Sequence, residues 1–323
     1  MPAQSLSQYQ KQKKSDVETL TIPNDLLVPS LNLGDDDVIS ELASASSWDL
    51  ATRYHEFKNK KSIQKNQKLG DHLRHISARA ILERAQKVLG SIVRPVDQHL
   101  GPSTEIPPEA THTELDLEET IENSPFLSQS DHVMTAQDVW MSYRIVRAQS
   151  VVLTVDTSLS MTGEKLALTA VALAVVLLQF PEEQIGIIAF ENEAKILKMP
   201  TEHISISELI ERFLEVPAQG YTHLEAGMRS ALAQIQSMDR GSNTKPISTV
   251  LLTDGKYTAG KDPAYLAPRF PHLVVLKMGD ERASLELCRE LARKGNGTLR
   301  EVANLDDLPA VMYSVVKDLL RGR

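Results

Sequence analysis

Oxygen-bearing side chains follow two apolar runs in the C-terminal half of the chain. SVVLTV (150–155) leads directly into DTSLS (156–160), and STVLLT (248–253) leads into Asp254. A third polar element, GYTH (220–223), opens a helical pattern between them. If both runs are parallel strands of one sheet, ligands are expected at their carboxyl ends. The side chains that would then converge are Asp156, Ser158, Ser160, Thr222 and Asp254.

Two carboxylates and three hydroxyls form a set of hard oxygen donors without a thiolate or an imidazole. Such a set, with positions open for water, suits Mg²⁺, or Mn²⁺ in its place. Each piece also has an ordinary structural interpretation, because Asp, Ser and Thr at these places are good helix N-caps. The occurrence of all five in three separate segments favours the metal site. His223 adjoins Thr222, but a magnesium-type site prefers oxygen, so we treat it as a neighbour.

A regular alternation of apolar runs and helical segments must position these side chains. Strands are expected at 150–155, 184–190, 194–199, 248–253, 272–278 and 298–302, and helices at 163–179, 207–214, 223–236, 263–269, 284–293 and 305–320. Continuous apolar strands separated by helices predict a doubly wound, Rossmann-like α/β domain with a mostly parallel sheet. Only three residues separate the second and third strands, so these two should form an antiparallel hairpin and provide one antiparallel edge strand.

The most apolar run, LALTAVALAVVLL, covers residues 166–178. A membrane-spanning helix needs about 20 such residues. We therefore expect a helix that is buried on nearly all sides of a core.

The N-terminal half is divided into blocks of opposite charge. Residues 15–50 carry eight acidic residues and no Lys or Arg, residues 51–95 carry eleven basic residues against three acidic ones, and residues 96–140 carry ten acidic residues and no Lys or Arg. Apolar spacing predicts an amphipathic helix at 68–89 and a weaker helix from Asp35 or Asp36 to about Tyr54. The prolines between Pro95 and Thr113 predict a linker or an extended excursion.

These patterns divide the chain into four parts. We expect a disordered segment at 1–15, a mainly helical N-terminal region at 16–95, an acidic linker or extension at 96–147 and the α/β domain at 148–323. The composition is that of a globular protein, with 41% hydrophobic residues and a net charge of -8. This acidic balance argues against a surface built for nucleic acid.

The cysteine content and the N-terminus bear on the compartment. Cys288 is the single cysteine, so it cannot form an intramolecular disulfide, and we expect it to be a small buried apolar group. The first residues lack the apolar stretch of a secretory signal. We therefore expect a cytoplasmic protein without a membrane span.

The five-residue motif resembles the metal-ion-dependent adhesion site (MIDAS) of von Willebrand factor type A (VWA) domains. The likeness rests on DTSLS, on Thr222 in GYTHLEAGM and on Asp254 in LLTDG, in that order, and spans about residues 148–320. It implies that the three hydroxyls are ligands and that the two aspartates hold the metal directly or through water. Leu159 stands where the family usually has glycine, and it is expected to point outside the ligand set.

The upstream segment HTELDLEETIENSP (112–125) extends the resemblance. It looks like the stretch that precedes the A domain in CoxE-like proteins and, more distantly, in magnesium-chelatase D-type subunits. Those proteins are companions of MoxR-class AAA+ ATPases. The resemblance therefore implies that this chain is an adaptor or co-factor protein of such an ATPase.

We expect a non-catalytic, metal-dependent protein–protein interaction module, in which a partner's Asp or Glu fills an open coordination position. A metal-dependent phosphohydrolase that uses the same ion is the alternative. It is disfavoured because no general base is evident beside the ligands, and the motifs GxxxxGK[ST], GxSxG and HExxH are absent. In a third interpretation the basic block contacts nucleic acid, acidic lipid or the acidic blocks of the chain itself.

Overall fold

The structure is a computed structural model of the chain. It describes residue 22 and residues 36–91, 98–108, 110–123, 133–145, 150–180, 185–218, 220–238, 246–282 and 284–321. The segment 1–15, expected to be disordered, lies outside the described residues.

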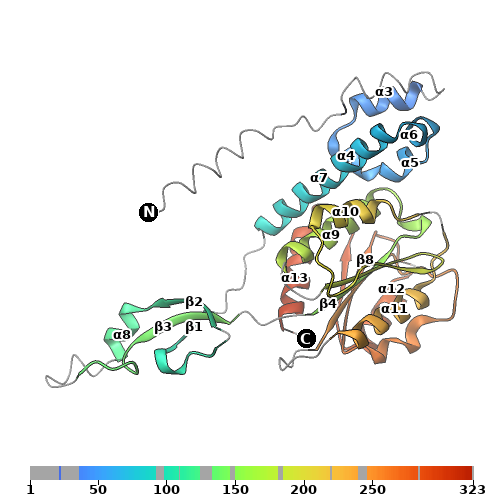
Figure 1. Ribbon diagram of the computed structural model, residues 1–323. Helices are drawn as coiled ribbons and strands as arrows, with labels where there is room; N and C mark the ends of the chain where they lie inside the picture. Colours follow the sequence, from blue (N-terminus) through green and yellow to red (C-terminus); the bar gives the residue numbers. More distant parts are fainter. Residues whose placement is uncertain are drawn as a thin grey trace.

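Six strands form the central sheet of the C-terminal half, in the order β6-β5-β4-β7-β8-β9 (Figure 1). Their bounds are β4 Val151–Asp156, β5 Ile185–Phe190, β6 Ala194–Lys198, β7 Ser248–Thr253, β8 His272–Met278 and β9 Leu299–Val302. Neighbouring strands are parallel except β5 and β6, which form an antiparallel hairpin at the edge. The predicted doubly wound sheet with one antiparallel edge strand is confirmed.

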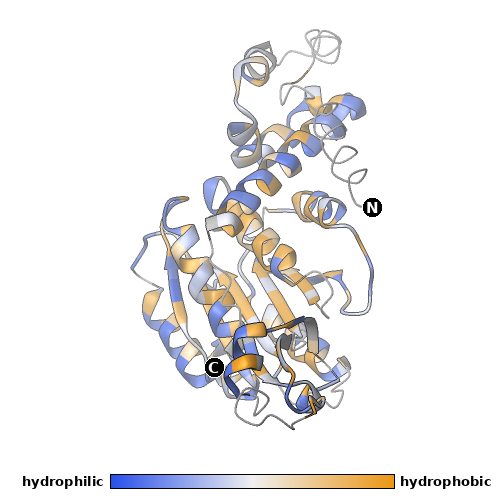
Figure 2. Ribbon diagram, turned by 90° about the vertical axis from the view of Figure 1, so that its left-hand side faces the viewer, coloured by the Kyte–Doolittle hydropathy of each residue, from blue (hydrophilic) through white to orange (hydrophobic). Residues whose placement is uncertain are grey.

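Alternate residues of the buried strands serve two separate cores. Val151, Leu153 and Val155 belong to one core and Val152 belongs to the other, as the two-residue repeat of a strand requires. The first core is covered by α9 (Glu164–Gln179), α10 (Ile206–Leu214) and α13 (Leu308–Arg321), and the second by α11 (Leu224–Ser237) and α12 (Leu285–Lys294). Figure 2 shows the hydrophobic residues concentrated on the strands and on the helices that cover them.

The structure describes five helices between residues 36 and 91, before this domain. They are α3 (Asp36–Ser44), α4 (Ser47–Thr52), α5 (Tyr54–Lys58), α6 (Lys61–Lys65) and α7 (Gln67–Ser91). The amphipathic helix expected at 68–89 is confirmed as α7. The single helix expected up to Tyr54 is wrong, because Ser46 interrupts it: Ser46 and Asp49 form a capping box that begins α4.

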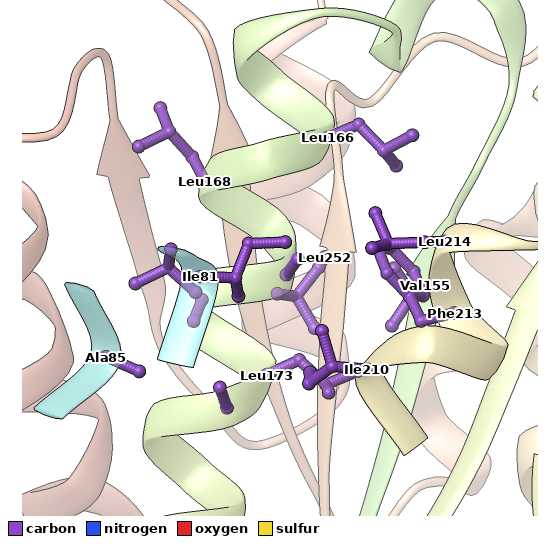
Figure 3. Packing of buried hydrophobic residues seen from close by; sticks show 14 of the residues in the cluster. Ile81, Ala85, Val155, Leu166, Leu168, Leu173, Ile210, Phe213, Leu214 and Leu252 are labelled. Atoms are coloured by element: carbon purple, nitrogen blue, oxygen red, sulfur yellow. The ribbon is translucent and has the colours of Figure 1, made fainter. Parts of the chain in front are cut away.

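Helix α7 packs directly on α9 and joins the first core. Figure 3 shows Ile81 and Ala85 of α7 beside Leu168 and Leu173 of α9. Because the sheet covers the other side of α9, residues 166–177 of that helix are all buried. The helix buried on nearly all sides is confirmed. No helix in the described part of the chain is both long and apolar enough to cross a membrane.

Polar contacts join the basic block to α10. The Lys58 ammonium donates hydrogen bonds to the carbonyls of Leu214 and Val216 at 2.9 and 3.3 Å, at the C-terminal end of α10, where a cation is favourable. The Arg74 guanidinium lies 3.5 Å from both Glu211 and Glu215. In the described residues the basic block pairs with α10, with acidic residues of its own and, through Arg53 and Glu41, with the first acidic block (15–50).

The acidic stretch after α7 contains a small antiparallel sheet of order β1-β3-β2. Its elements are β1 (Gln98–Pro102), β2 (Ala110–Leu115), α8 (Leu117–Asn123) and β3 (Trp140–Ile145). The sequence analysis expected a linker or an extended excursion between Pro95 and Thr113, so it did not predict these two strands. Both are edge strands, where proline is tolerated: Pro102 is the last residue of β1, and Pro107 and Pro108 lie in the connection to β2.

The shared core predicts that α7 and the α/β domain unfold together. Ile81→Ala removes a fully buried side chain between α7 and α9, so it should lower the free energy of unfolding by about 2–5 kcal/mol in one transition. Urea unfolding followed by circular dichroism measures this change. Lys87→Ala, on the exposed side of the same helix, is the control and should be close to neutral. A separate early transition confined to the helices would contradict the shared core.

Candidate metal centre

All five predicted ligands lie at the carboxyl edge of the parallel strands. Asp156 is the last residue of β4, and Ser158 and Ser160 follow it in the loop that leads to α9. Asp254 comes directly after β7, the parallel neighbour of β4. Thr222 lies two residues before α11. Three loops therefore carry the set, as the sequence predicts: 156–160, 220–223 and 254–259.

Backbone hydrogen bonds tie the three loops together. The Leu159 N–H donates to the Gly220 carbonyl at 3.2 Å, which links the first loop to the second. The Thr222 N–H donates to the Thr258 hydroxyl at 3.0 Å, and the Thr258 N–H donates back to the Thr222 carbonyl at 3.0 Å. The loop of Thr222 is thus bonded to both loops that carry the carboxylates.

The turn between β5 and β6 fixes the loop of Thr222 from a third side. The Gly220 N–H donates to the Glu191 carboxylate and the Tyr221 N–H donates to the Asn192 side-chain oxygen, both at 2.8 Å. The His223 N–H donates to the Glu191 carbonyl at 2.7 Å, and His223 Nδ1 lies 3.1 Å from the Asn192 carbonyl. His223 therefore serves loop packing. From the sequence, ENE (191–193) was only a short connection between two strands. Nothing in it predicted that Glu191 and Asn192 hold the loop of Thr222.

Asp156 is fully buried and accepts two hydrogen bonds. Its Oδ1 accepts from the Ser158 N–H at 2.9 Å and its Oδ2 accepts from the Thr253 hydroxyl at 2.6 Å. Burial nevertheless raises the pKa of Asp156 to about 7, because desolvation of the carboxylate outweighs the donors of Thr253 and Ser158. The hydroxyl oxygens of Ser158 and Ser160 lie 3.2 Å apart in the same loop.

Asp254 is also fully buried, and one of its oxygens lacks a hydrogen-bond donor. Its Oδ1 accepts from the Lys256 N–H at 3.1 Å, whereas Oδ2 has no hydrogen-bond partner among the described residues. The ammonium groups of Lys256 and Lys165 lie 3.6 and 3.9 Å from Oδ2, within ion-pair range only. Lys165 also pairs with Glu281 and holds the pKa of that carboxyl at about 2.

The residues present fit a hard dication. They offer an unpartnered carboxylate oxygen on Asp254, a second buried carboxylate on Asp156 and adjacent hydroxyls. The described residues include no group of three or more His, Cys, Asp or Glu side chains that could hold a metal ion. A metal at this edge would therefore need the hydroxyls of Ser158, Ser160 and Thr222 as well as the two carboxylates.

The loop after β7 requires a glycine directly after Asp254. Gly255 has a φ of 77°, and a Cβ at this position would lie 2.4 Å from Cys288 Sγ. Cys288 is fully buried, as expected. The Ser284 hydroxyl donates to the Asp254 carbonyl, so α12 also fixes this loop. Thr253, Ser284 and the two lysines were missed by the sequence analysis, and only Thr253, beside Asp254, carried a recognisable signal.

Each ligand-bearing loop also exposes one large apolar or aromatic side chain. Leu159 is 61% exposed, Tyr221 is 72% exposed, and Tyr257, in the loop of Asp254, is 40% exposed. Leu159 thus points outside the ligand set, as expected. These three residues, here called the apolar rim, adjoin the candidate ligands in sequence and face solvent.

Comparisons with known proteins agree with this architecture. Residues 151–256 match the family model described as von Willebrand factor type A domain, and all five candidate ligands lie within this range. A search of curated proteins found no match.

Several solved structures are similar to the chain, and three of them share 16% or 17% identity with it. One is the conserved hypothetical protein BatB from Bacteroides thetaiotaomicron, with 17% identity, a TM-score of 0.42, and coverage of 54% of this chain and 100% of that one. Another is a von Willebrand factor type A structure from Catenulispora acidiphila, with 16% identity, a TM-score of 0.43, and coverage of 56% and 44%. A third is proximal thread matrix protein 1 from the mussel byssus with a zinc-occupied MIDAS motif, with 16% identity, a TM-score of 0.45, and coverage of 53% and 48%.

The raised pKa of Asp156 predicts how stability changes with pH. The folded chain holds this proton up to about pH 7, whereas an unfolded aspartate releases it near its ordinary pKa of 3.8. The metal-free protein therefore loses stability as the pH rises from about 3.8 to about 7. Asp156→Asn removes the titration. In EDTA, the stability of the variant relative to the wild type should therefore increase from pH 5 to pH 8 in urea unfolding. A difference that is constant over this range would contradict the raised pKa.

Proposed function

We propose that residues 148–323 form a divalent-metal-dependent protein–protein interaction module. Mg²⁺, or Mn²⁺ in its place, binds at the five-residue site described above. The observation that carries this proposal is the buried Asp254 Oδ2, which lacks a hydrogen-bond donor, beside a second buried carboxylate. An isolated buried charge is costly, and a bound dication offsets the cost for both aspartates.

The donor set favours recognition of a carboxylate. Three of the five candidate ligands are neutral hydroxyls, so they leave part of the charge of the ion uncompensated. When bound, the ion supplies an electrophilic position that an Asp or Glu of a partner can fill. The apolar rim around this position supports a protein partner, because exposed aromatic side chains around a polar centre are typical of interaction sites.

The partner that we propose is a MoxR-class AAA+ ATPase, for which this chain acts as an adaptor or co-factor protein. Support for this choice comes from the resemblance of residues 112–125 to the segment that precedes the A domain of CoxE-like proteins.

We propose that the site does not catalyse a reaction. The basic side chains nearest to Asp254 are Lys165 and Lys256, and both form ion pairs with Asp254 and with Glu281. Neither is placed as a free general base beside the candidate ligands. The chain therefore holds the ion for recognition, in contrast to a phosphohydrolase that uses it as a Lewis acid.

Asp254→Asn tests the metal site and the function together. The amide keeps the shape of the side chain but removes its charge, so Mg²⁺ affinity should fall at least tenfold in isothermal titration calorimetry, and Mg²⁺ should no longer raise the melting temperature. Asp306→Asn, an exposed aspartate outside the site, is the control and should bind as the wild type does.

The same two variants test the partner and the absence of catalysis. Capture of the purified ATPase should need Mg²⁺, should stop in EDTA and should fail with Asp254→Asn alone. Wild-type affinity for Mg²⁺ in Asp254→Asn would contradict the metal site. Turnover of generic phosphate esters by the wild type, lost in Asp254→Asn, would favour the phosphohydrolase.

A further inference from the structure

Exposed large apolar side chains gather in two parts of the described chain. Twelve are exposed, and six of these lie in residues 98–145: Leu100, Leu115, Leu117, Ile121, Val133 and Met134. Three others form the apolar rim of the candidate metal site, namely Leu159, Tyr221 and Tyr257. Clustered exposed apolar side chains are typical of interaction sites, so both parts of the chain are candidates for one.

The first surface combines exposed apolar residues with acidic ones. Around α8, Leu117 is 64% exposed and Ile121 is also exposed, and they alternate with the exposed acidic residues Glu118 and Glu122. Neither glutamate forms an ion pair within the described residues. We call residues 114–122 the acidic segment. Its composition fits a cationic surface that also offers apolar contacts.

The metal site becomes such a surface when a dication is bound. Asp156, Asp254 and Glu281 carry three negative charges when ionised, and Lys165 and Lys256 carry two positive ones within ion-pair distance of Asp254 and Glu281. A bound dication therefore changes the net charge of these five groups from −1 to +1. The apolar rim lies on the same three loops as the candidate ligands, so the metal-loaded site offers the acidic segment both a positive charge and apolar side chains.

The fold presents the acidic segment to a second molecule. β3 ends at Ile145 and β4 begins at Val151, so the small sheet joins the amino end of β4, whereas the metal site lies at the carboxyl end of that strand. Figure 1 shows α8 at the end of the small sheet that is farthest from the α/β domain.

Building on the proposed function, we propose that the acidic segment of one copy docks on the metal face of a second copy. Glu118 or Glu122 completes the coordination of the metal, while Leu117 and Ile121 pack on the apolar rim. The two surfaces differ, so the contact is head-to-tail, and each added copy offers a free site to the next. An external partner that presents a carboxylate competes for the same face.

Sedimentation of the full chain tests this contact. With Mg²⁺, the average mass of the wild type should rise with concentration and pass the mass of a dimer, and EDTA should return it to the monomer. Leu117→Lys changes the acidic segment, and Tyr221→Asp changes the metal face, because it removes part of the apolar rim and adds a negative charge. Each variant alone should stay monomeric with Mg²⁺, because each removes one of the two surfaces. Val133→Lys, on an exposed residue outside the segment, is the control and should associate as the wild type does.

A mixture of the two defective variants gives the decisive result. Leu117→Lys keeps the metal face and Tyr221→Asp keeps the acidic segment, so an equimolar mixture should form a dimer and stop there. If the wild type binds Mg²⁺ but remains monomeric at every concentration, this result would contradict the contact between copies. It would not contradict the metal site. Failure to bind Mg²⁺ in the calorimetric titration would overturn the metal site itself. Association that persists in EDTA, or a mixture that forms no dimer, would also overturn the contact.

Discussion

The burial of two carboxylates at one edge of the sheet is the constraint on which the site depends. Asp156 and Asp254 are both fully buried, and a buried charge without compensation is strongly unfavourable. The chain compensates Asp156 with two hydrogen-bond donors and Asp254 with one donor and two ammonium groups beyond hydrogen-bond distance. The compensation of Asp254 is incomplete, and this is the physical reason to place a cation beside it.

The surrounding structure holds these side chains in place through short, specific links. Thr253 joins β7 to Asp156 and also accepts the Gly255 N–H, so one hydroxyl orients both carboxylate loops. The β5–β6 turn holds the loop of Thr222 through Glu191 and Asn192. The N-terminal helices pack on the side of α9 that faces away from the sheet and complete the first core. The loop 156–160 leads from this core into α9. Preorganisation of this kind lowers the cost of ordering the loops when a ligand binds.

Much of the α/β domain could be predicted from the sequence because its signals are local. Buried parallel strands appear as short apolar runs, and the three-residue ENE connection dictates a hairpin. The positions of Asp156, Ser158, Ser160 and Asp254 followed from the strand ends, and that of Thr222 from the start of a helical pattern. The contacts of Lys165 and Glu281 did not, because they join a helix start to a loop 116 residues away. The three-stranded sheet was missed for a related reason: its prolines indicate a linker unless the edge position of the strands is known.

The interpretation as a metal-dependent interaction module rests on a dication at the carboxyl edge of β4 and β7. A crystal structure of the chain grown with Mn²⁺ tests this most directly, because the anomalous scattering of manganese locates the ion without assumptions about its ligands. We predict one anomalous peak beside Asp254 Oδ2, coordinated by hydroxyls of Ser158, Ser160 and Thr222, with Asp156 bound directly or through water. A map at saturating Mn²⁺ with no peak at this edge, and with Lys165 or Lys256 hydrogen-bonded to Asp254 Oδ2, would contradict it.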